Sequence, residues 1–210
     1  MVAEDLEKEI QEITNIIVSQ GFTVREGSTS VGELQYLSYV AQRCNAKMIG
    51  EIGFHIGFSS LAFLRTNPEI KVISFDVGEY EYVKLAKKII DQKFPGRHTL
   101  IYGDSRKTVP VFKKSNPEFY FDLIFIDGGH DYNIAKADIK NMRLLSIKET
   151  CVVMDDITPW LSWGTGPTRA WKEAVKEGII AQKELYKDGK LVTEIEPPGE
   201  RSWVMGRYIF

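Results

Sequence analysis

Residues 121–131 read Phe-Asp-Leu-Ile-Phe-Ile-Asp-Gly-Gly-His-Asp, and this stretch decides the fold. The run 121–126, apolar but for one aspartate, is typical of a strand buried in a parallel sheet. It ends abruptly in Asp127, two glycines, His130 and Asp131. In open α/β sheets, ligands bind just beyond the carboxyl ends of such strands. Taken alone, the segment also fits an ordinary polar turn after a strand, so its meaning depends on the rest of the chain.

The overall composition is that of a soluble globular protein. The chain has 210 residues, enough for one domain with a substantial core, and is 43% hydrophobic and 27% charged. A net charge of −2 and the lack of a Lys/Arg run indicate no nucleic-acid partner. No apolar stretch approaches the roughly 20 residues that span a bilayer, and the sequence after Met1 is too acidic for a signal peptide. We therefore expect a cytoplasmic protein without a membrane partner.

The two cysteines, Cys44 and Cys151, lie in apolar surroundings and lack metal-site spacing. In a reducing compartment such residues remain thiols. We therefore expect two buried thiols and no disulfide.

The chain alternates strand and helix patterns over most of its length. Two amphipathic helices are expected first, at residues 4–20 and 32–44, joined by a polar connector at 22–31. Strands then follow at residues 48–52, 71–76, 99–102, 121–127 and 151–154, with helices at 59–65, 80–93 and 134–145. This alternation favours a parallel, right-handed, doubly wound sheet.

The C-terminal part has a different pattern. A helix begins near Gly166-Pro167, with proline in its first turn. Two short strands, 183–186 and 191–195, flank Asp188-Gly189, a hairpin-turn dipeptide, and a last strand covers 202–209. We expect antiparallel strands added at one sheet edge. No repeat or linker divides the chain, which predicts one domain, 1–210, with an N-terminal helical cap at 1–45 and a core at 46–210.

A glycine turn follows the first strand, in the pattern Glu51-x-Gly53-x-x-x-Gly57. Glycine lets the backbone approach a ligand closely, and the amino end of the next helix favours an anionic group. The pattern differs from the dinucleotide motif Gly-x-Gly-x-x-Gly, because His55 interrupts it and the spacing is wrong. His55 itself is expected to pack or to contact a cofactor.

Acidic residues also end the second and third strands. Asp76 follows Gly53 by 23 residues, where a carboxylate can accept the two hydroxyls of a ribose. Asp104, followed by Ser105, is placed to hold an adenine amino group. Each acid alone can equally be a helix cap. Acids at the ends of three successive strands favour a binding site.

The fourth and fifth strands end in Asp127 and in the pair Asp155-Asp156. Adjacent parallel strands would bring these carboxylates to one rim, where they repel each other unless protons or a cation compensate. Oxygen ligands suit Mg²⁺ or Ca²⁺, and also Mn²⁺. In the alternative interpretation, Asp156 caps a turn and Asp155 alone lines the pocket.

Several aromatic side chains and histidines have two interpretations each. His130 is either a general base or a loop residue that stays at the surface or binds a substrate oxygen. Tyr132, Trp160 and Trp163 are expected to line an acceptor pocket, although the two tryptophans can equally pack a loop onto the core. His98 is expected at the surface, at the start of a strand.

Together these motifs resemble a known family. The segments 51–60, 103–105, 125–132 and 153–157, with Asp76 between them, occur in the order found in class I S-adenosylmethionine-dependent methyltransferases. The chain is most similar to the metal-dependent O-methyltransferases of the macrolide-sugar and aminocoumarin type, and more distantly to catechol O-methyltransferase. The resemblance covers about residues 46–175. The Ile-Asp-Gly-Gly-His segment paired with Asp-Asp is its most specific part.

The resemblance implies an α/β fold with a Rossmann-like, doubly wound, seven-stranded sheet, mostly parallel with an antiparallel edge strand, preceded by N-terminal helices. It also implies the following site. The methionine part of the cofactor would lie by Glu51, Gly53 and Gly57, with Ser59 or Ser60 at its carboxylate, the ribose at Asp76, and the adenine at Asp104 and Ser105. Asp127, Asp155 and Asp156 would bind a divalent metal, with Asp127 also beside the cofactor. His130 would be the general base, or Asp127 would take the proton.

The expected activity is therefore S-adenosylmethionine-dependent O-methylation of a hydroxyl on a small molecule or sugar, with Mg²⁺ as the metal. One alternative is a nucleotide-cofactor dehydrogenase or nucleotide-sugar enzyme, against which the missing Gly-x-Gly-x-x-Gly counts. Another is a non-catalytic module that keeps the cofactor pocket, against which the intact acids and His130 count. The sequence is also compatible with a homo-oligomer.

Overall fold

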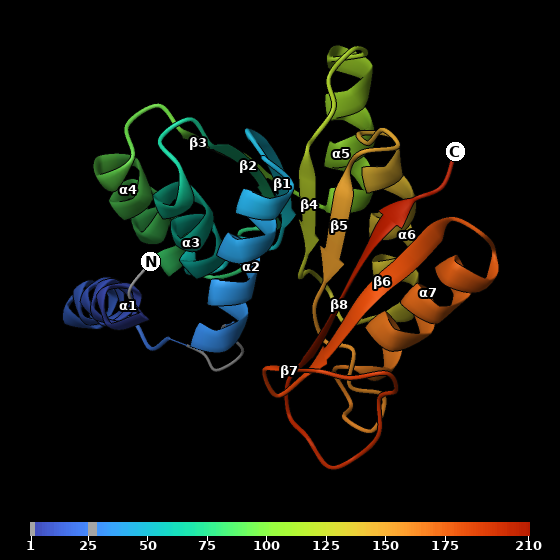
Figure 1. Cartoon of the computed structure of the whole chain (residues 1–210). Coiled ribbons are helices and arrows are strands. Elements are labelled where there is room, and N and C mark those ends of the chain that lie inside the picture. Colours follow the sequence, from blue (N-terminus) through green and yellow to red (C-terminus); the bar gives the residue numbers. More distant parts are fainter. Residues whose placement is uncertain (1–2, 25–28) are drawn as a thin grey trace.

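A computed structural model describes residues 3–24 and 29–210, and in it a single twisted sheet separates two layers of helices (Figure 1). The eight strands are β1 (Met48–Ile52), β2 (Lys71–Asp76), β3 (His98–Tyr102), β4 (Leu123–Ile126), β5 (Cys151–Met154), β6 (Ile180–Lys187), β7 (Lys190–Leu191) and β8 (Ser202–Tyr208). Their order in the sheet is β3-β2-β1-β4-β5-β8-β6-β7. Within the described residues, no helix is long and apolar enough to cross a membrane.

The first five strands are parallel, so their carboxyl ends meet at one edge of the sheet. β1 pairs with β2 on one side and with β4 on the other, which makes the boundary between β1 and β4 the point where the winding direction switches. Ligands of doubly wound folds bind in the crevice at such a point. β8 is antiparallel to both of its neighbours, β5 and β6.

In the part of the chain that the structure describes, seven helices cover the two faces of the sheet. On one side lie α1 (Ala3–Ser19), α2 (Val31–Arg43), α3 (Phe58–Thr66) and α4 (Tyr82–Lys93), and on the other lie α5 (Ser105–Ser115), α6 (Tyr132–Arg143) and α7 (Thr165–Lys176) (Figure 1). Successive strand residues point to opposite faces. Phe125 and Val153 belong to the core under the first layer, whereas Ile124 and Val152 belong to the core under the second.

The structure confirms the predicted Rossmann-like, mostly parallel sheet with its added antiparallel strand and its N-terminal helices. The sheet has eight strands instead of the implied seven, because β7 pairs with β6; of the strand predicted at 191–195, only this two-residue pairing forms. The predicted hairpin turn is present: Asp188 and Gly189 both have positive φ, 48° and 78°, and join paired Lys187 and Lys190. The predicted connector 22–31 lies partly outside the described residues.

One helix was not expected from the sequence. α5 occupies the segment between β3 and β4, for which the pattern predicted no helix. Pro110 lies inside it and removes one backbone N–H, which normally argues against a helix interior. The helix forms nevertheless, because Asp104 caps its amino end and Val109 is buried against the second core.

The expectation of two separate thiols was wrong. The structure joins Cys44, at the carboxyl end of α2, to Cys151, at the start of β5, in a disulfide with a Cα–Cα distance of 7.0 Å. The two residues are 107 positions apart in the sequence. The pairing depends on how α2 lies across the sheet, and neither local pattern contains that information.

Candidate active site

A pocket of about 550 Å³ lies at the carboxyl ends of β1, β2, β3 and β4. Six of the predicted cofactor residues line it: Gly53, Ser59, Asp76, Asp104, Ser105 and Asp127. His130 lines it as well. Glu51, Gly57 and Ser60 are not among the lining residues. The pocket therefore occupies the switch point, where a doubly wound sheet binds its ligand.

The glycine turn after β1 is required by close backbone packing. Gly53 has a φ of +89°, and a Cβ atom there would lie 1.8 Å from the carbonyl oxygen of Asp127. Gly57 has a φ of +82° and precedes the first residue of α3. The two turns that follow β1 and β4 therefore touch through backbone atoms, which shapes the floor of the pocket.

Asp76 fastens this turn to the end of β2. Its Oδ2 accepts hydrogen bonds from the backbone N–H groups of Phe54 (2.8 Å) and His55 (2.9 Å), and its Oδ1 accepts one from Gly78 (2.6 Å). Three backbone donors fix the orientation of the carboxylate in the pocket wall. Asp76, the residue predicted to bind the ribose, is thus held rigidly at the pocket.

Glu51 lies at the centre of a buried polar cluster. Its carboxylate accepts hydrogen bonds from Ser59, from Ser60 (2.7 Å) and from Ser74 (2.5 Å). Burial raises the pKa of Glu51, and the three hydroxyl groups act in the opposite direction. The hydroxyls predicted to meet the cofactor carboxylate therefore also hold Glu51 in place.

His98 belongs to the same cluster, which corrects the expectation of a surface residue. It is 6% exposed, lies 2.9 Å from the Ser74 hydroxyl and stacks on the ring of Phe54 at 4.8 Å between centroids. Burial, followed by the charge of Lys87, lowers its pKa to about 3. Its position at a strand start suggested exposure, but α4 and the glycine turn cover it.

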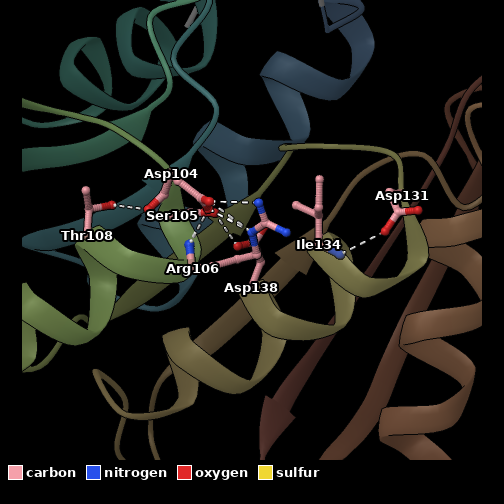
Figure 2. A network of polar contacts seen from close by, with 7 residues as sticks. All are labelled: Asp104, Ser105, Arg106, Thr108, Asp131, Ile134 and Asp138. Atoms are coloured by element: carbon pink, nitrogen blue, oxygen red, sulfur yellow. Dashed lines mark hydrogen bonds and ion pairs between the residues drawn. The ribbon is translucent and has the colours of Figure 1, made fainter.

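Asp104 and Ser105 follow the third strand and take part in the network of polar contacts that Figure 2 shows. Both residues also line the pocket. Asp104 accepts a hydrogen bond from the backbone N–H of Arg106 and forms an ion pair with its guanidinium at 2.7 Å. These hydrogen bonds lower the pKa of Asp104 to about 2. Ser105 donates to Asp138 of α6 at 2.6 Å. The capping role considered for Asp104 is thus present together with its place at the pocket.

Asp138 gives the stability of the protein a pH dependence. Burial raises the pKa of its carboxyl from 3.8 to about 6, and one of its oxygens has no hydrogen-bond partner. The carboxyl group of Asp138 binds its proton more tightly in the folded protein than in the unfolded one, so its protonation stabilises the fold. This stabilisation is complete below the unfolded-state pKa and is lost as pH rises through about 6. Asp138→Asn removes the ionisation. We expect the free energy of unfolding of Asp138→Asn, taken relative to that of wild type, to be about 2 kcal/mol higher at about pH 8 than at about pH 4.

Urea unfolding of both proteins at the two pH values measures this difference. A stability difference that stays constant between them would contradict the role assigned to Asp138.

The three strand-end aspartates lie close together, as predicted, and form an acidic rim beside the pocket. Possible ligand oxygens of Asp127, Asp155 and Asp156 all lie within 4.8 Å of one another. Burial and then the charges of Asp155 and Asp156 raise the pKa of Asp127, and burial with the charge of Asp156 raises that of Asp155 to about 7. One oxygen of Asp155 has no hydrogen-bond partner. The positive charge of Arg201 lowers the pKa of both Asp127 and Asp155, but it is the smallest of the effects on each carboxyl group.

His130 connects the rim to the pocket. Its Nε2 lies 2.9 Å from Oδ2 of Asp156, and its side chain is 50% exposed. The hydrogen bond to Asp156 raises the pKa of His130. The imidazole therefore lies at the edge of both features, within reach of a molecule that enters from solvent.

Two of the three aromatic residues considered for an acceptor pocket form hydrogen bonds to other segments of the chain. Trp160 donates its indole N–H to the carbonyl of Gly199 at 2.9 Å, and the Tyr132 hydroxyl is hydrogen-bonded to Glu173. Trp163 is 42% exposed. None of the three lines the described pocket. Conversely, the sequence did not indicate Thr29 or Tyr80, which do line it, nor Glu33, which is buried against the rim.

Comparisons with known proteins agree with this geometry. A family model described as a methyltransferase domain matches residues 51–157, from Glu51 through the aspartate pair. No curated protein sequence matches significantly.

Solved structures share the fold at low identity. An O-methyltransferase from Bacillus cereus in complex with SAH is 16% identical with a TM-score of 0.73, covering 94% of this chain and 89% of its own. Cofactor-bound Rv0187 from MTB is 16% identical with a TM-score of 0.75, covering 97% and 89%. The TDP-rhamnose 3'-O-methyltransferase CalS11, from calicheamicin biosynthesis, is 18% identical with a TM-score of 0.63, covering 96% and 92%.

The family model spans about half of the chain and includes the strand ends that build the pocket and the rim. The expected enzyme class, a methyltransferase, is thereby confirmed. The chain belongs to the methyltransferase-domain family, as its resemblance to class I methyltransferases predicted.

Proposed function

We propose that this methyltransferase uses S-adenosylmethionine and a divalent cation, Mg²⁺ foremost, to methylate a hydroxyl group of a small molecule or sugar. The observation that carries the proposal is the junction of pocket and rim. Asp127 lines the pocket and also belongs to the close group of three aspartates. A ligand in the pocket and a cation at the rim would therefore be neighbours.

The pocket supports the cofactor assignment. S-adenosylmethionine, when bound, supplies a methyl group on a positively charged sulfur. Asp76 would hold the ribose, and Asp104 with Ser105 would frame the adenine. Glu51, Gly53, Gly57, Ser59 and Ser60 would surround the methionine part. The structures from Bacillus cereus and MTB contain SAH or a cofactor in the same fold, and CalS11 is described as acting on a sugar hydroxyl.

The rim fits a divalent cation. Asp127, Asp155 and Asp156 offer only oxygen ligands, which is the donor set of Mg²⁺ and Mn²⁺. The oxygen of Asp155 that lacks a partner is a buried acceptor that a cation would satisfy. A divalent cation, when bound, lowers the pKa of a hydroxyl group that it contacts.

The chain's own residues would orient the acceptor and move its proton. The His130 imidazole, held at Nε2 by Asp156, lies at the rim on the solvent side and is a candidate to take the hydroxyl proton, with Asp127 as the other candidate. The fixed carboxylates and glycine turn hold the reactants in place, which is the main contribution expected of the protein in such a transfer.

We also propose that the N-terminal helices and the sheet form one domain. Leu6 of α1 and Leu34 of α2 are fully buried in the same core as Phe63 and Phe125. A helical cap that shares the core of the sheet is part of one folding unit.

Calorimetric titration with S-adenosylmethionine and with NAD tests the cofactor, and formation of S-adenosylhomocysteine in a screen of hydroxylated acceptors with Mg²⁺ tests the reaction. We expect the protein to bind S-adenosylmethionine and not NAD, and to turn over an acceptor only when Mg²⁺ is present. Tight binding of NAD alone would refute the cofactor assignment. Cofactor binding without turnover on any acceptor would favour the non-catalytic module.

Asp76→Asn is expected to weaken S-adenosylmethionine binding by about tenfold to a hundredfold, because a charged acceptor of ribose hydroxyls becomes a neutral amide. The affinity measured by calorimetry should fall while the divalent-cation affinity stays the same. Unchanged cofactor affinity would contradict the ribose assignment of Asp76.

A further inference from the structure

Asp138 is a buried acid that the predicted site does not include. It lies in α6 and is 1% exposed, and its Oδ2 atom has no hydrogen-bond partner in the described residues. Burying a carboxylate costs free energy unless its oxygens are hydrogen-bonded, so a buried oxygen without a partner calls for a physical reason. The position of Asp138 behind the pocket provides that reason.

The two oxygens of Asp138 meet two segments that border the pocket. Its Oδ1 accepts a hydrogen bond from the Ser105 hydroxyl at 2.6 Å, a contact within the network of Figure 2. Its Oδ2 lies against Gly128, where a Cβ atom would be 3.2 Å away from it. Ser105 follows β3 and Gly128 follows β4, and both residues line the pocket. Asp138 therefore supports the pocket wall from behind.

The contact with Asp138 fixes the direction of the Ser105 hydroxyl. A serine hydroxyl has one hydrogen to donate and two lone pairs that accept, whereas an ionised carboxylate can only accept. Burial raises the pKa of Asp138 to about 6, so its carboxyl group is ionised at pH 8. Because the hydrogen of Ser105 is given to Asp138, the serine oxygen can offer only an acceptor to a molecule in the pocket.

The neighbouring acid, Asp104, is already engaged. Both of its oxygens accept from the Arg106 guanidinium at 2.7 to 3.1 Å, and Oδ1 also accepts from the Arg106 backbone N–H. By contrast, no group among the described residues donates to the Ser105 hydroxyl oxygen. Ser105 is therefore the acceptor at this strand end whose lone pairs are unused.

We propose that Asp138 is a positioning residue that holds Ser105 as the acceptor for the exocyclic amino group of adenine, so that the pocket selects adenine over hypoxanthine. Adenine carries a donor amino group at the position where hypoxanthine carries a carbonyl oxygen, which is an acceptor. A site built to accept a hydrogen bond rejects an analogue that cannot donate one. The inference rests on the proposed function, since it requires the adenine to lie at Asp104 and Ser105.

Binding of S-adenosylhomocysteine and of its deaminated analogue, S-inosylhomocysteine, tests the proposal by calorimetry at pH 8. Wild type should prefer the adenine compound by about tenfold to a hundredfold, because the hypoxanthine oxygen leaves a buried acceptor unpaired. Asp138→Leu has a similar branched shape and no hydrogen-bonding atom, so the Ser105 hydroxyl becomes free to turn and to donate to the hypoxanthine oxygen. This variant should lose most of the preference.

A double variant separates this role from simple packing. If Asp138 acts through Ser105, Asp138→Leu should not change the preference further once Ser105→Ala has removed the hydroxyl. A residue that only packs α6 would weaken both ligands by the same factor and leave their ratio at the wild-type value. Asp91→Asn, which alters a surface ion pair with Lys87, is the control and should keep the full preference.

Asp138→Asn provides a second variant, because its amide nitrogen can donate to the Ser105 oxygen and free the hydroxyl hydrogen. A wild-type preference in both Asp138→Leu and Asp138→Asn would overturn the role of Asp138. Equal affinity of wild type for the two compounds would overturn the selection of adenine and leave the cofactor assignment intact. Failure of wild type to bind S-adenosylhomocysteine would overturn the cofactor in the proposed function. The same titrations therefore distinguish the three failures.

Discussion

Replacing Asp155 by alanine is expected to reduce methyl transfer by about a thousandfold or more, and to abolish its dependence on Mg²⁺. Asp155 is 4% exposed and lies in the close group of three aspartates, with one oxygen still free to accept. Loss of one ligand removes several kcal/mol of charge stabilisation, and about 1.4 kcal/mol corresponds to each factor of ten in rate. Steady-state assays at a series of Mg²⁺ concentrations measure the effect.

Two controls make the result interpretable. The affinity of the variant for S-adenosylhomocysteine should remain close to that of wild type, because Asp155 does not line the pocket. Retained binding would also show that the variant is folded. Asp91→Ala, which removes a surface ion pair with Lys87, should retain full activity. Turnover of Asp155→Ala that still responds to Mg²⁺ would refute its assignment as a ligand.

Replacing Gly53 by alanine is expected to cost about 4 kcal/mol or more of folding stability, because backbone strain and a backbone clash add. The new Cβ would lie 1.8 Å from the carbonyl oxygen of Asp127, so the turns after β1 and β4 would have to separate. Cofactor and cation binding should both weaken, because both features are built on that contact. Urea unfolding and calorimetry measure the two effects.

Gly96→Ala is the matched control. Gly96 also has a positive φ, +70°, but no atom lies within 4 Å of its virtual Cβ. Only the conformational strain of about 1 kcal/mol remains there. If Gly53→Ala proved no more destabilising than Gly96→Ala, the close approach between the two turns would not be a requirement of the fold.

Much of the fold and the rim follows from local pattern combined with one geometric rule. The apolar run before Asp127 and the one before Asp155 indicate adjacent buried strands, and parallel strands present their carboxyl ends at one edge. The structure accordingly gathers Asp127, Asp155 and Asp156. Strand-end acids can be predicted in this way because their positions depend on the sheet and on little else.

The sequence patterns did not predict the features that depend on how a helix lies across the sheet. Glu33 has the spacing of an ordinary helix cap, and Cys44 gives no sign of its partner on β5. His98 is covered by α4 and the glycine turn, although its neighbours in the sequence are polar. In each case the deciding contact comes from a segment far away in the chain. Pro110 is a different case, in which a cap and a buried face outweigh a local preference.

A crystal soaked with S-adenosylhomocysteine and Mn²⁺, measured for anomalous scattering, tests the central claim most directly. The proposed function predicts the nucleoside in the pocket lined by Asp76 and Ser105, and an anomalous peak between Asp127, Asp155 and Asp156 at about 2 to 2.5 Å from their oxygens. An occupied nucleoside pocket with no anomalous peak at the three aspartates would contradict a cation-dependent methyl transfer at this site.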